Sequence, residues 1–156
     1  MTERIWAPWR IRYLTQKNKT CLFCKASKSK NKDRKNFVIL RSKYSFSMLN
    51  LFPYNNGHVM VSPYRHIKDT NLLTNEEIVD LFGLIKKSKK LLDKVLKPHS
   101  YNLGINLGKS AGAGIEHLHV HLVPRWDGDT NFMPVVFDTK IISQSLDELY
   151  KKLKNA

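Results

Sequence analysis

The sequence predicts an α+β domain, with an antiparallel sheet of about five strands, one long helix packed on it and a C-terminal helix. Short segments rich in β-branched and aromatic residues are separated by turn-forming residues, which is typical of strands. One long segment, residues 74–98, instead repeats its apolar residues at helical spacing. With 156 residues and 42% hydrophobic content, the chain can bury one ordinary core, so we expect a single domain over residues 1–156.

Five segments are predicted as strands because each is short and combines β-branched, aromatic and aliphatic residues. They are residues 36–40, 44–51, 58–66, 101–107 and 117–123. The sequence FPYNNG at residues 52–57 contains Pro, Asn-Asn and Gly, so it reverses the chain and makes its neighbouring strands antiparallel. The last two strands flank a glycine-bearing loop, GKSAGAGIE, at residues 108–116.

The long helix is predicted over residues 74–98. Thr74 or Asn75 can cap its first turn, acidic residues follow, and lysines and Pro98 stand near its end, as the helix dipole favours. The residues expected on its apolar side are Ile78, Leu81, Phe82, Ile85, Leu91, Leu92 and Val95. A second amphipathic segment, residues 139–156, predicts the C-terminal helix, and the charged residues 25–36 predict a mobile loop.

Charge and hydropathy narrow the class of protein. No stretch has the roughly 18 consecutive apolar residues of a membrane span, and the first residues lack the pattern of a secretory signal. We therefore expect a cytoplasmic protein that does not bind membranes. The formal charge of +14 favours phosphate-rich ligands, but the lysines are spread along the chain and form no recognition helix. Nucleic acid is thus a disfavoured partner, and a nucleotide is a favoured one.

Three histidines alternate along one predicted strand. Because side chains alternate between the faces of a strand, His117, His119 and His121 share one face and the intervening apolar residues share the other. Exposed imidazoles on a solvated sheet face are the structural alternative, but they leave the strict alternation unexplained. The preceding loop can bring backbone N–H groups, Lys109 and Ser110 close to a phosphate. The segment therefore indicates phosphate chemistry.

A pair of cysteines, Cys21 and Cys24, stands in the sequence CLFC near the start of the chain. This spacing supplies half of a tetrahedral zinc site, and His66 and His117 are candidates for the other half. Two reduced, packed thiols are the alternative. A redox role is disfavoured because a charged loop follows the pair, where a thioredoxin motif would have its strand-to-helix context.

The chain resembles the histidine triad (HIT) superfamily of nucleotide hydrolases and transferases. The resemblance rests on NLFPYNNGHVMVSPYRH, on INLGKSAGAGIEHLHVHLVPR and on the order of elements between them, and it covers residues 37–125. It implies a HIT-like fold with this segment as its core. Residues 1–36 then form an N-terminal extension with the cysteine pair and the basic loop, and residues 126–156 form a C-terminal extension.

The resemblance also implies catalytic roles. His119 matches the nucleophile that attacks the α-phosphorus of a nucleotide and gives a covalent nucleotidyl-histidine. In the family, a main-chain carbonyl next to the first histidine, here His117, holds the other nitrogen of the nucleophile. His121 matches the histidine that contacts the phosphate and the leaving group, and His58 matches a fourth histidine of the same site.

Substrate contacts follow from the same comparison. The matching positions are Asn50 for the ribose and Asn106 for the phosphates. In the glycine-bearing loop, the residues expected to bind the substrate are Lys109, Ser110, Gly112, Ala113 and Gly114. Simple turn or strand-edge roles are the alternatives for the two asparagines. Ala113 and Gly114 depart from the family, which often carries Gln and then Ser or Thr there. Backbone N–H groups, Lys109 and Ser110 would then replace those side-chain contacts.

The flanking sequences RIWAPWRIRYL and PRWDGDTNFMPV resemble the bacterial and archaeal branch of diadenosine tetraphosphate phosphorylases. The fragile-histidine-triad hydrolases of dinucleoside polyphosphates are similar as well. Cleavage of such substrates, resolved by water or phosphate, is the implied activity. Alternatives are a nucleoside phosphoramidase, which hydrolyses P–N bonds, and a basic nucleic-acid-binding module.

Cofactors and assembly are implied by the resemblance too. Zinc-bearing relatives use a cysteine pair, a later histidine and the first triad histidine, which here are Cys21, Cys24, His66 and His117, as a structural zinc site. A divalent ion such as Mg²⁺ can arrive with the substrate. Family members are commonly homodimers, with the long helix and a sheet edge contributing, so we expect a homodimer.

Overall fold

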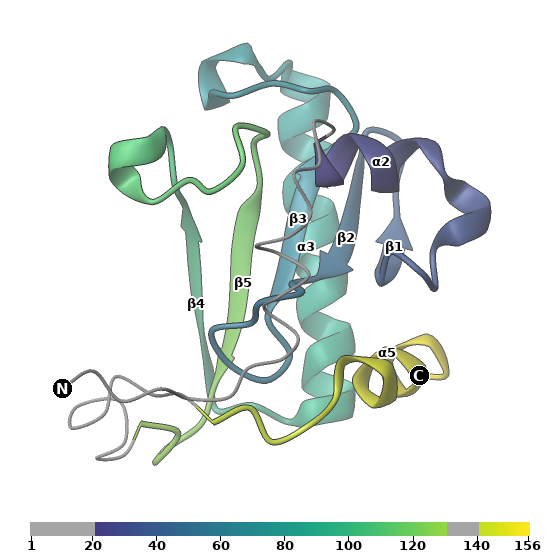
Figure 1. Cartoon of the computed structure of the whole chain (residues 1–156), viewed down its shortest axis with the longest axis vertical. Coiled ribbons are helices and arrows are strands. Elements are labelled where there is room, and N and C mark those ends of the chain that lie inside the picture. Colours follow the sequence, from purple (N-terminus) through teal and green to yellow (C-terminus); the bar gives the residue numbers. More distant parts are fainter. Residues whose placement is uncertain (1–20, 131–140) are drawn as a thin grey trace, which may run out of the picture.

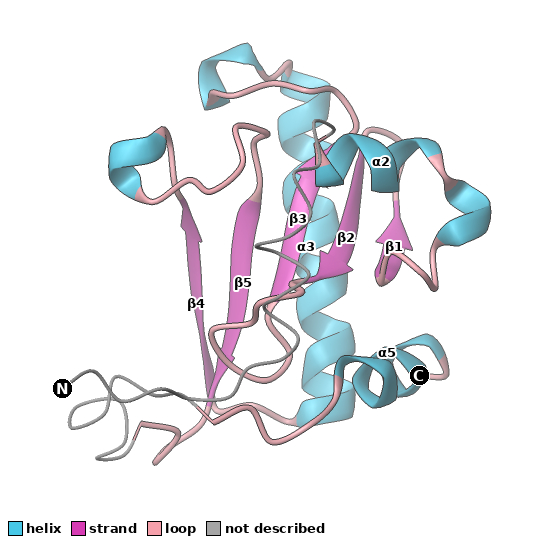
Figure 2. Cartoon of the chain, viewed as in Figure 1, coloured by secondary structure: helices cyan, strands magenta, loops and turns pink. Residues whose placement is uncertain are grey.

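The computed structural model describes residues 21–130 and 141–156. Figure 1 shows one twisted sheet with a long helix running along it, and Figure 2 separates strands from helices by colour. The strands are β1 (Val38–Arg41), β2 (Ser45–Leu49), β3 (Val59–Pro63), β4 (Ser100–Ile105) and β5 (Val120–Arg125). The helices are α2 (Leu22–Lys28), α3 (Asn75–Leu96) and α5 (Leu146–Lys154), with short 3-10 turns η2 (Lys30–Lys32), η3 (Thr70–Leu72) and η4 (Lys109–Ala111). The predicted α+β class, with its antiparallel sheet, long helix and C-terminal helix, is confirmed.

The order of strands places the histidine segment inside the sheet. The order is β1-β2-β3-β5-β4, and all neighbouring strands are antiparallel. His121 of β5 lies opposite Met60 of β3 and Gly104 of β4, so the backbone beside this histidine is paired on both sides. β4, by contrast, is an edge strand, and most of its side chains are exposed.

The start of α3 is fixed by a capping box. The Thr74 hydroxyl accepts a hydrogen bond from the Glu77 backbone N–H, and the Glu77 carboxylate accepts one from the Thr74 N–H. Of the two predicted caps, Thr74 is therefore the one used. The same carboxylate accepts hydrogen bonds from the Arg65 guanidinium at 2.7 Å, which ties the helix to the segment after β3.

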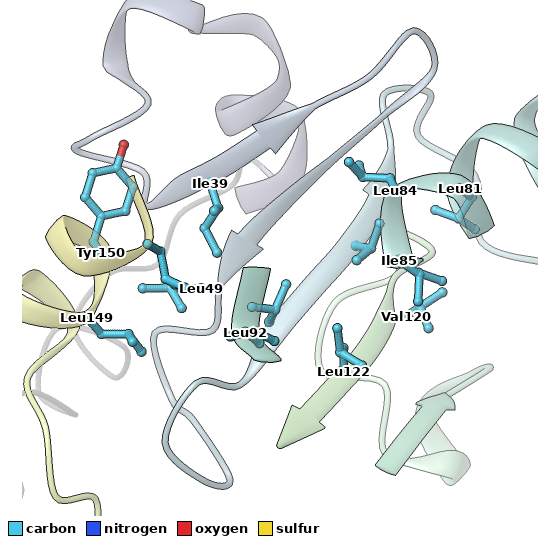
Figure 3. Packing of buried hydrophobic residues seen from close by; sticks show 13 residues of the cluster. Ile39, Leu49, Leu81, Leu84, Ile85, Leu92, Val120, Leu122, Leu149 and Tyr150 are labelled. Carbon is cyan, nitrogen blue, oxygen red and sulfur yellow. The ribbon is translucent and has the colours of Figure 1, made fainter. Parts of the chain in front are cut away.

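Helices α3 and α5 cover one face of the sheet, which we call the α3 face (Figure 3). Its buried residues are Ile39, Leu49, Val59, Val61, Leu81, Leu84, Ile85, Leu92, Val120, Leu122, Leu149, Tyr150 and Leu153. The predicted apolar side of α3 is wrong in part, because Ile78 and Phe82 are 39% and 54% exposed while Leu84 is buried. The sheet covers only part of a wide apolar stripe, and the helix is rotated so that Leu84 and Ser88 turn inward.

The opposite face of the sheet, which we call the α2 face, is covered by α2 and carries a smaller apolar cluster. It contains Phe23, Ala26, Val38, Phe46, Met48 and Met60. The prediction of a mobile loop over residues 25–36 is wrong at its start, because α2 extends to Lys28 and η2 follows. Phe23 and Ala26 lie three residues apart on the helix and both are fully buried, so their packing outweighs the local excess of lysine.

The C-terminal helix is shorter than predicted. α5 begins at Leu146 because the hydroxyl of Ser145 accepts a hydrogen bond from the backbone N–H of Glu148. Residues 141–144 precede it without helical structure, and the first two residues of the predicted segment lie outside the described residues. Over residues 21–130 and 141–156, no helix is long and apolar enough to cross a bilayer.

Candidate active site

The three triad histidines lie on the α2 face, as their alternation predicted. β5 begins only at Val120, so His117 and His119 stand in the extended approach to the strand. The alternation of faces continues through this approach, since the Phe23 ring contacts His117 and His119 while Val120 belongs to the α3 face. All three imidazoles are buried, and the ring centroids of His119 and His121 are 4.8 Å apart.

The tautomer of His119 is fixed by the main chain. Its Nδ1 lies 2.7 Å from the carbonyl oxygen of His117. A carbonyl oxygen can only accept a hydrogen bond, so Nδ1 carries the hydrogen and Nε2 keeps a free lone pair. Burial lowers the pKa of His119, which favours the neutral ring. These are the two conditions that an imidazole nucleophile requires.

A second chain of hydrogen bonds fixes His58 and His121. The backbone N–H of Tyr54 donates to Nδ1 of His58 at 3.1 Å, so the hydrogen of this ring is on Nε2. Nε2 of His58 then donates to Nδ1 of His121 at 2.9 Å, which leaves the His121 hydrogen on its own Nε2. This Nε2 is buried and has no hydrogen-bond partner among the described residues. A donor is thus directed into the site beside the free lone pair of His119.

Burial keeps the other site histidines neutral as well. The pKa of His58 is lowered to about 3, mainly by burial and to a smaller extent by the nearby His121 and His119. For His117 and His121, burial is again the main cause, and their pKa values are about 4. All of these rings are therefore uncharged at neutral pH, so each nitrogen acts as donor or acceptor according to the tautomers above.

Phe23 forms one wall of the site. Its ring stacks on His119 with 4.8 Å between centroids and an interplanar angle of 28°, and it lies 5.2 Å from His117. Phe23 is fully buried in the apolar cluster of the α2 face. Its ring therefore limits how far the His119 imidazole can rotate. Phe23 was not predicted as a site residue, although its place between the two cysteines was a usable signal.

The predicted phosphate loop lies at the end of β4. Positive φ angles at Gly108 and Gly112 let the chain turn tightly around η4, and the Asn106 side-chain amide donates to the Gly112 carbonyl at 3.5 Å. The side chains of Lys109 and Ser110, in η4, are exposed. Of the family departures, Ala113 is half-buried and Gly114 is exposed. Asn106, Gly108, Ala113 and His117 all line one cavity of about 290 Å³.

Asn50 lies at the end of β2 and already has partners within the chain. Its Oδ1 accepts a hydrogen bond from the backbone N–H of Phe52, so its amide group points Nδ2 toward Nδ1 of His58, at 3.2 Å. This arrangement agrees with the tautomer of His58, because both Asn50 and Tyr54 donate to the same lone pair. Asn50 is therefore close to the histidines, and it also serves as a turn residue.

The four predicted zinc ligands come together at the N-terminal end of α2. The ligand atoms of Cys21, Cys24, His66 and His117 all lie within 4.8 Å of one another. His117 Nδ1 is 3.3 Å from the Cys21 sulfur, and His66 Nδ1 is 3.2 Å from the Cys24 sulfur. Tetrahedral zinc would place sulfur and nitrogen ligands about 3.6 Å apart, so the donor set and its spacing fit this ion.

The tautomer of His117 also suits a metal ligand. Its Nε2 lies 3.0 Å from the carbonyl oxygen of Pro63, so the hydrogen is on Nε2 and the lone pair of Nδ1 faces the sulfurs of the two cysteines. The His117 ring thus belongs to the candidate metal site, while its carbonyl oxygen accepts the hydrogen bond from His119. His99 lies outside both groups, and its Nδ1 accepts a hydrogen bond from the Asp127 backbone N–H.

The fold and the alternating histidines together define a histidine-triad domain. The model of the HIT domain family matches residues 31–128, and the chain belongs to this family. AP-4-A phosphorylase of Mycobacterium tuberculosis is 38% identical over 160 residues, which cover 97% of this chain and 82% of that protein. The asymmetrical bis(5'-nucleosyl)-tetraphosphatase of Schizosaccharomyces pombe is 36% identical over 100 residues, which cover 64% of this chain and 55% of that protein.

Solved structures agree on the fold. A Zn-bound histidine triad family protein from Mycobacterium smegmatis superposes with a TM-score of 0.66 at 22% identity, over 87% of this chain and 91% of that chain. At this identity the likeness concerns the fold alone. The predicted membership of the HIT superfamily is confirmed by the family match and by the sequence relatives.

Proposed function

We propose that this protein is an enzyme that cleaves dinucleoside polyphosphates of the diadenosine tetraphosphate type at the α-phosphate, through a covalent nucleotide on His119. The main support is a pair of imidazole nitrogens whose protonation is set by hydrogen bonds that start at the main chain. His119 offers a lone pair on Nε2, and His121 offers a hydrogen on Nε2, with 4.8 Å between the two ring centroids. Relatives that are named for reactions of such substrates support the same proposal.

In the first step, Nε2 of His119 attacks the α-phosphorus, a P–N bond forms, and the bond to the bridging oxygen breaks. The leaving polyphosphate departs as an anion, and the Nε2–H of His121 donates a hydrogen bond to its terminal oxygen. The ring of His119 now carries positive charge, which the His117 carbonyl oxygen stabilises through Nδ1–H. Asn106, the backbone of residues 108–114 and Lys109 would hold the phosphate oxygens.

In the second step, an oxygen of water or inorganic phosphate attacks the same phosphorus, and the P–N bond breaks. The electron pair returns to Nε2 of His119, and the proton of the acceptor is released to solvent. Neutral histidines and a chain with formal charge +14 suit both steps, because the barrier to attack on a phosphodiester is largely charge repulsion.

Product analysis tests this proposal. Diadenosine tetraphosphate is incubated with the protein, with and without inorganic phosphate, and the nucleotides are separated. Formation of AMP and ATP indicates hydrolysis, whereas ADP and ATP indicate phosphorolysis. The His119→Ala variant should fold normally and lose turnover, and wild-type rates in this variant would refute the assignment. A phosphoramidate substrate, run in parallel, tests the alternative of a P–N hydrolase.

We also propose that Cys21, Cys24, His66 and His117 hold a structural zinc ion. Zinc would add a cross-link between α2 and the segment before β5, and so stabilise the position of His119. Metal analysis of the purified protein should give about one zinc per chain. His66→Ala should lose this zinc, and His99→Ala, which removes a histidine outside the cluster, should keep it. Equal metal content in both variants would contradict the proposal.

We also propose that the protein is a homodimer and that it is located in the cytoplasm. The outer side of α3 exposes Ile78, Val79 and Phe82, and the unpaired edge strand β4 exposes Leu103 and Ile105. Apolar side chains next to an unpaired strand edge are suited to a second copy of the chain. Light scattering should give twice the chain mass for the wild type and the mass of one chain for Phe82→Glu. A dimeric Phe82→Glu protein would place the contact elsewhere.

A further inference from the structure

The turn between β2 and β3 carries an aromatic ring that the proposed function does not use. Tyr54 is 58% exposed, and its ring centroid lies 4.6 Å from that of His58 and 5.6 Å from that of His121. Only the backbone N–H of Tyr54 is needed to fix the tautomer of His58, and any residue other than proline would supply it. The exposed ring therefore calls for a separate explanation.

The aromatic and imidazole rings of the site form a row that runs from a buried end to an exposed end. Phe23 contacts His119, His119 contacts His121, His121 contacts His58, and His58 contacts Tyr54, with centroid distances of 4.6 to 5.1 Å at each step. The nucleophile lies toward the buried end, next to Phe23. Tyr54 lies at the other end, beyond the donor of His121, and it is the exposed end of the row.

The proposed reaction predicts which part of the substrate lies at the exposed end of this row of rings. The α-phosphorus is bonded to His119 in the first step, and the leaving oxygen accepts from Nε2 of His121, so the leaving group extends from His119 past His121. A leaving nucleotide ends in a nucleobase, whose flat π-face stacks on exposed aromatic rings. We infer that Tyr54 is a stacking site for the nucleobase of the leaving nucleotide. This inference rests on the proposed function.

Such a site makes the second nucleoside a determinant of specificity. The enzyme would bind a dinucleoside polyphosphate more tightly than a mononucleoside polyphosphate with the same number of phosphates, because only the former has a second base to stack. Stacking of one base on an aromatic side chain corresponds to a change of roughly tenfold in affinity. The tyrosine hydroxyl is not required, so phenylalanine or tryptophan should replace tyrosine, whereas leucine should not.

The test compares diadenosine tetraphosphate with adenosine 5'-tetraphosphate, which has the same four phosphates but ends in a free phosphate where the dinucleoside carries its second adenosine. KM is measured for the wild type, Tyr54→Phe, Tyr54→Trp and Tyr54→Leu. The wild type and both aromatic variants should show a KM about tenfold lower for the dinucleoside. Tyr54→Leu should close this gap by raising the KM for the dinucleoside alone. Leu72→Ala, which truncates another exposed apolar side chain, should preserve the gap.

Two outcomes would overturn the inference. One is an equal rise in KM for both substrates in Tyr54→Leu, which would assign the ring to the retained nucleotide. The other is a loss of the gap in Tyr54→Phe, which would assign the effect to the hydroxyl. If the proposed function itself is wrong, the wild type should turn over neither tetraphosphate, and the inference about Tyr54 is then wrong as well.

Discussion

The two faces of β5 carry residues of opposite kinds within a few positions. Val120 and Leu122 point to the α3 face and pack in an entirely apolar cluster (Figure 3). His119 and His121 point to the α2 face, where each imidazole is buried and has at least one nitrogen held by a hydrogen bond. The segment from His119 to Leu122 thus contributes hydrophobic stabilisation with one set of side chains and the imidazoles of the proposed active site with the other.

The α2 face buries imidazoles, whereas the α3 face buries mostly apolar side chains. Burying a polar group costs free energy unless it is hydrogen-bonded, and the α2 face leaves the His121 Nε2 without a partner among the described residues. The α3 face also buries two hydroxyls without a partner among the described residues, those of Ser47 and Ser88, but its thirteen buried apolar side chains can offset this cost. We therefore expect substitutions on the α3 face to change stability and those on the α2 face to change chemistry.

The largest effect should come from a comparison of two single substitutions at adjacent residues of β5. His121→Leu removes the donor to the leaving group and should lower kcat by about 10²–10⁴-fold. The free energy of unfolding should change little, because the unpartnered Nε2 is removed while the His58 N–H loses its acceptor. Leu122→Ala should cost about 2–5 kcal/mol of stability while the folded protein keeps its kcat. Urea denaturation and initial rates measure both. Similar losses of kcat in the two variants would remove the distinction between the faces.

Phe23 tests whether the α2 face also positions the nucleophile by packing. Phe23→Ala should cost about 3–5 kcal/mol of stability, so the milder Phe23→Leu is the variant for kinetics. Phe46→Leu is a matched control, because Phe46 is also fully buried in the α2 cluster but stacks on Tyr64. Only Phe23→Leu should slow formation of the nucleotidyl-histidine in single-turnover experiments. Equal slowing in both would mean that general packing is responsible.

The buried histidines should make stability depend on pH. The pKa of His58 is about 3 in the folded protein, below the value of about 6.5 in the unfolded chain, so the unfolded chain binds more protons between these values. Its contribution is complete above about pH 6.5 and is lost as the pH falls toward 3. Between pH 7 and 4.5, the wild type should lose about 2 kcal/mol more than His58→Gln. A His58→Gln protein with the wild-type dependence on pH would contradict this expectation.

The smallest effect concerns the capping box of α3. Thr74→Ala should cost about 1 kcal/mol in the free energy of unfolding, because the Glu77 N–H loses its side-chain acceptor. The α2 face should not respond, so kcat should stay at the wild-type value. Thermal unfolding and initial rates measure the two effects. A large fall in kcat would show that the start of α3 is coupled to the histidines.

The sequence predicted the elements whose patterns are strictly periodic. Alternation in the histidine segment predicted one shared face, and the capping residues of α3 predicted its start within a residue. The clustering of Cys21, Cys24, His66 and His117 followed from the resemblance to the HIT superfamily. These features depend on local geometry or on a specific motif, and both can be read along the chain.

What could not be predicted depends on tertiary contacts. The helix α2 is short and rich in lysine, and only the fold shows that Phe23 and Ala26 have a surface on which to pack. The rotation of α3 is set by the width of the sheet beneath it, so Ile78 and Phe82 were misplaced. Tyr54 looked like one residue of a turn, because nothing local shows that its ring lies against His58 and His121.

The main chain decides which nitrogen of each site imidazole carries hydrogen. Carbonyl oxygens of Pro63 and His117 and the N–H of Tyr54 make this choice directly or through a neighbouring ring. Main-chain groups thus select the tautomers, and each ring should give a single set of nitrogen resonances in NMR spectra. The hydrogen at Nδ1 of His119 should also exchange slowly with deuterated solvent, since it can be released only when the chain around it opens.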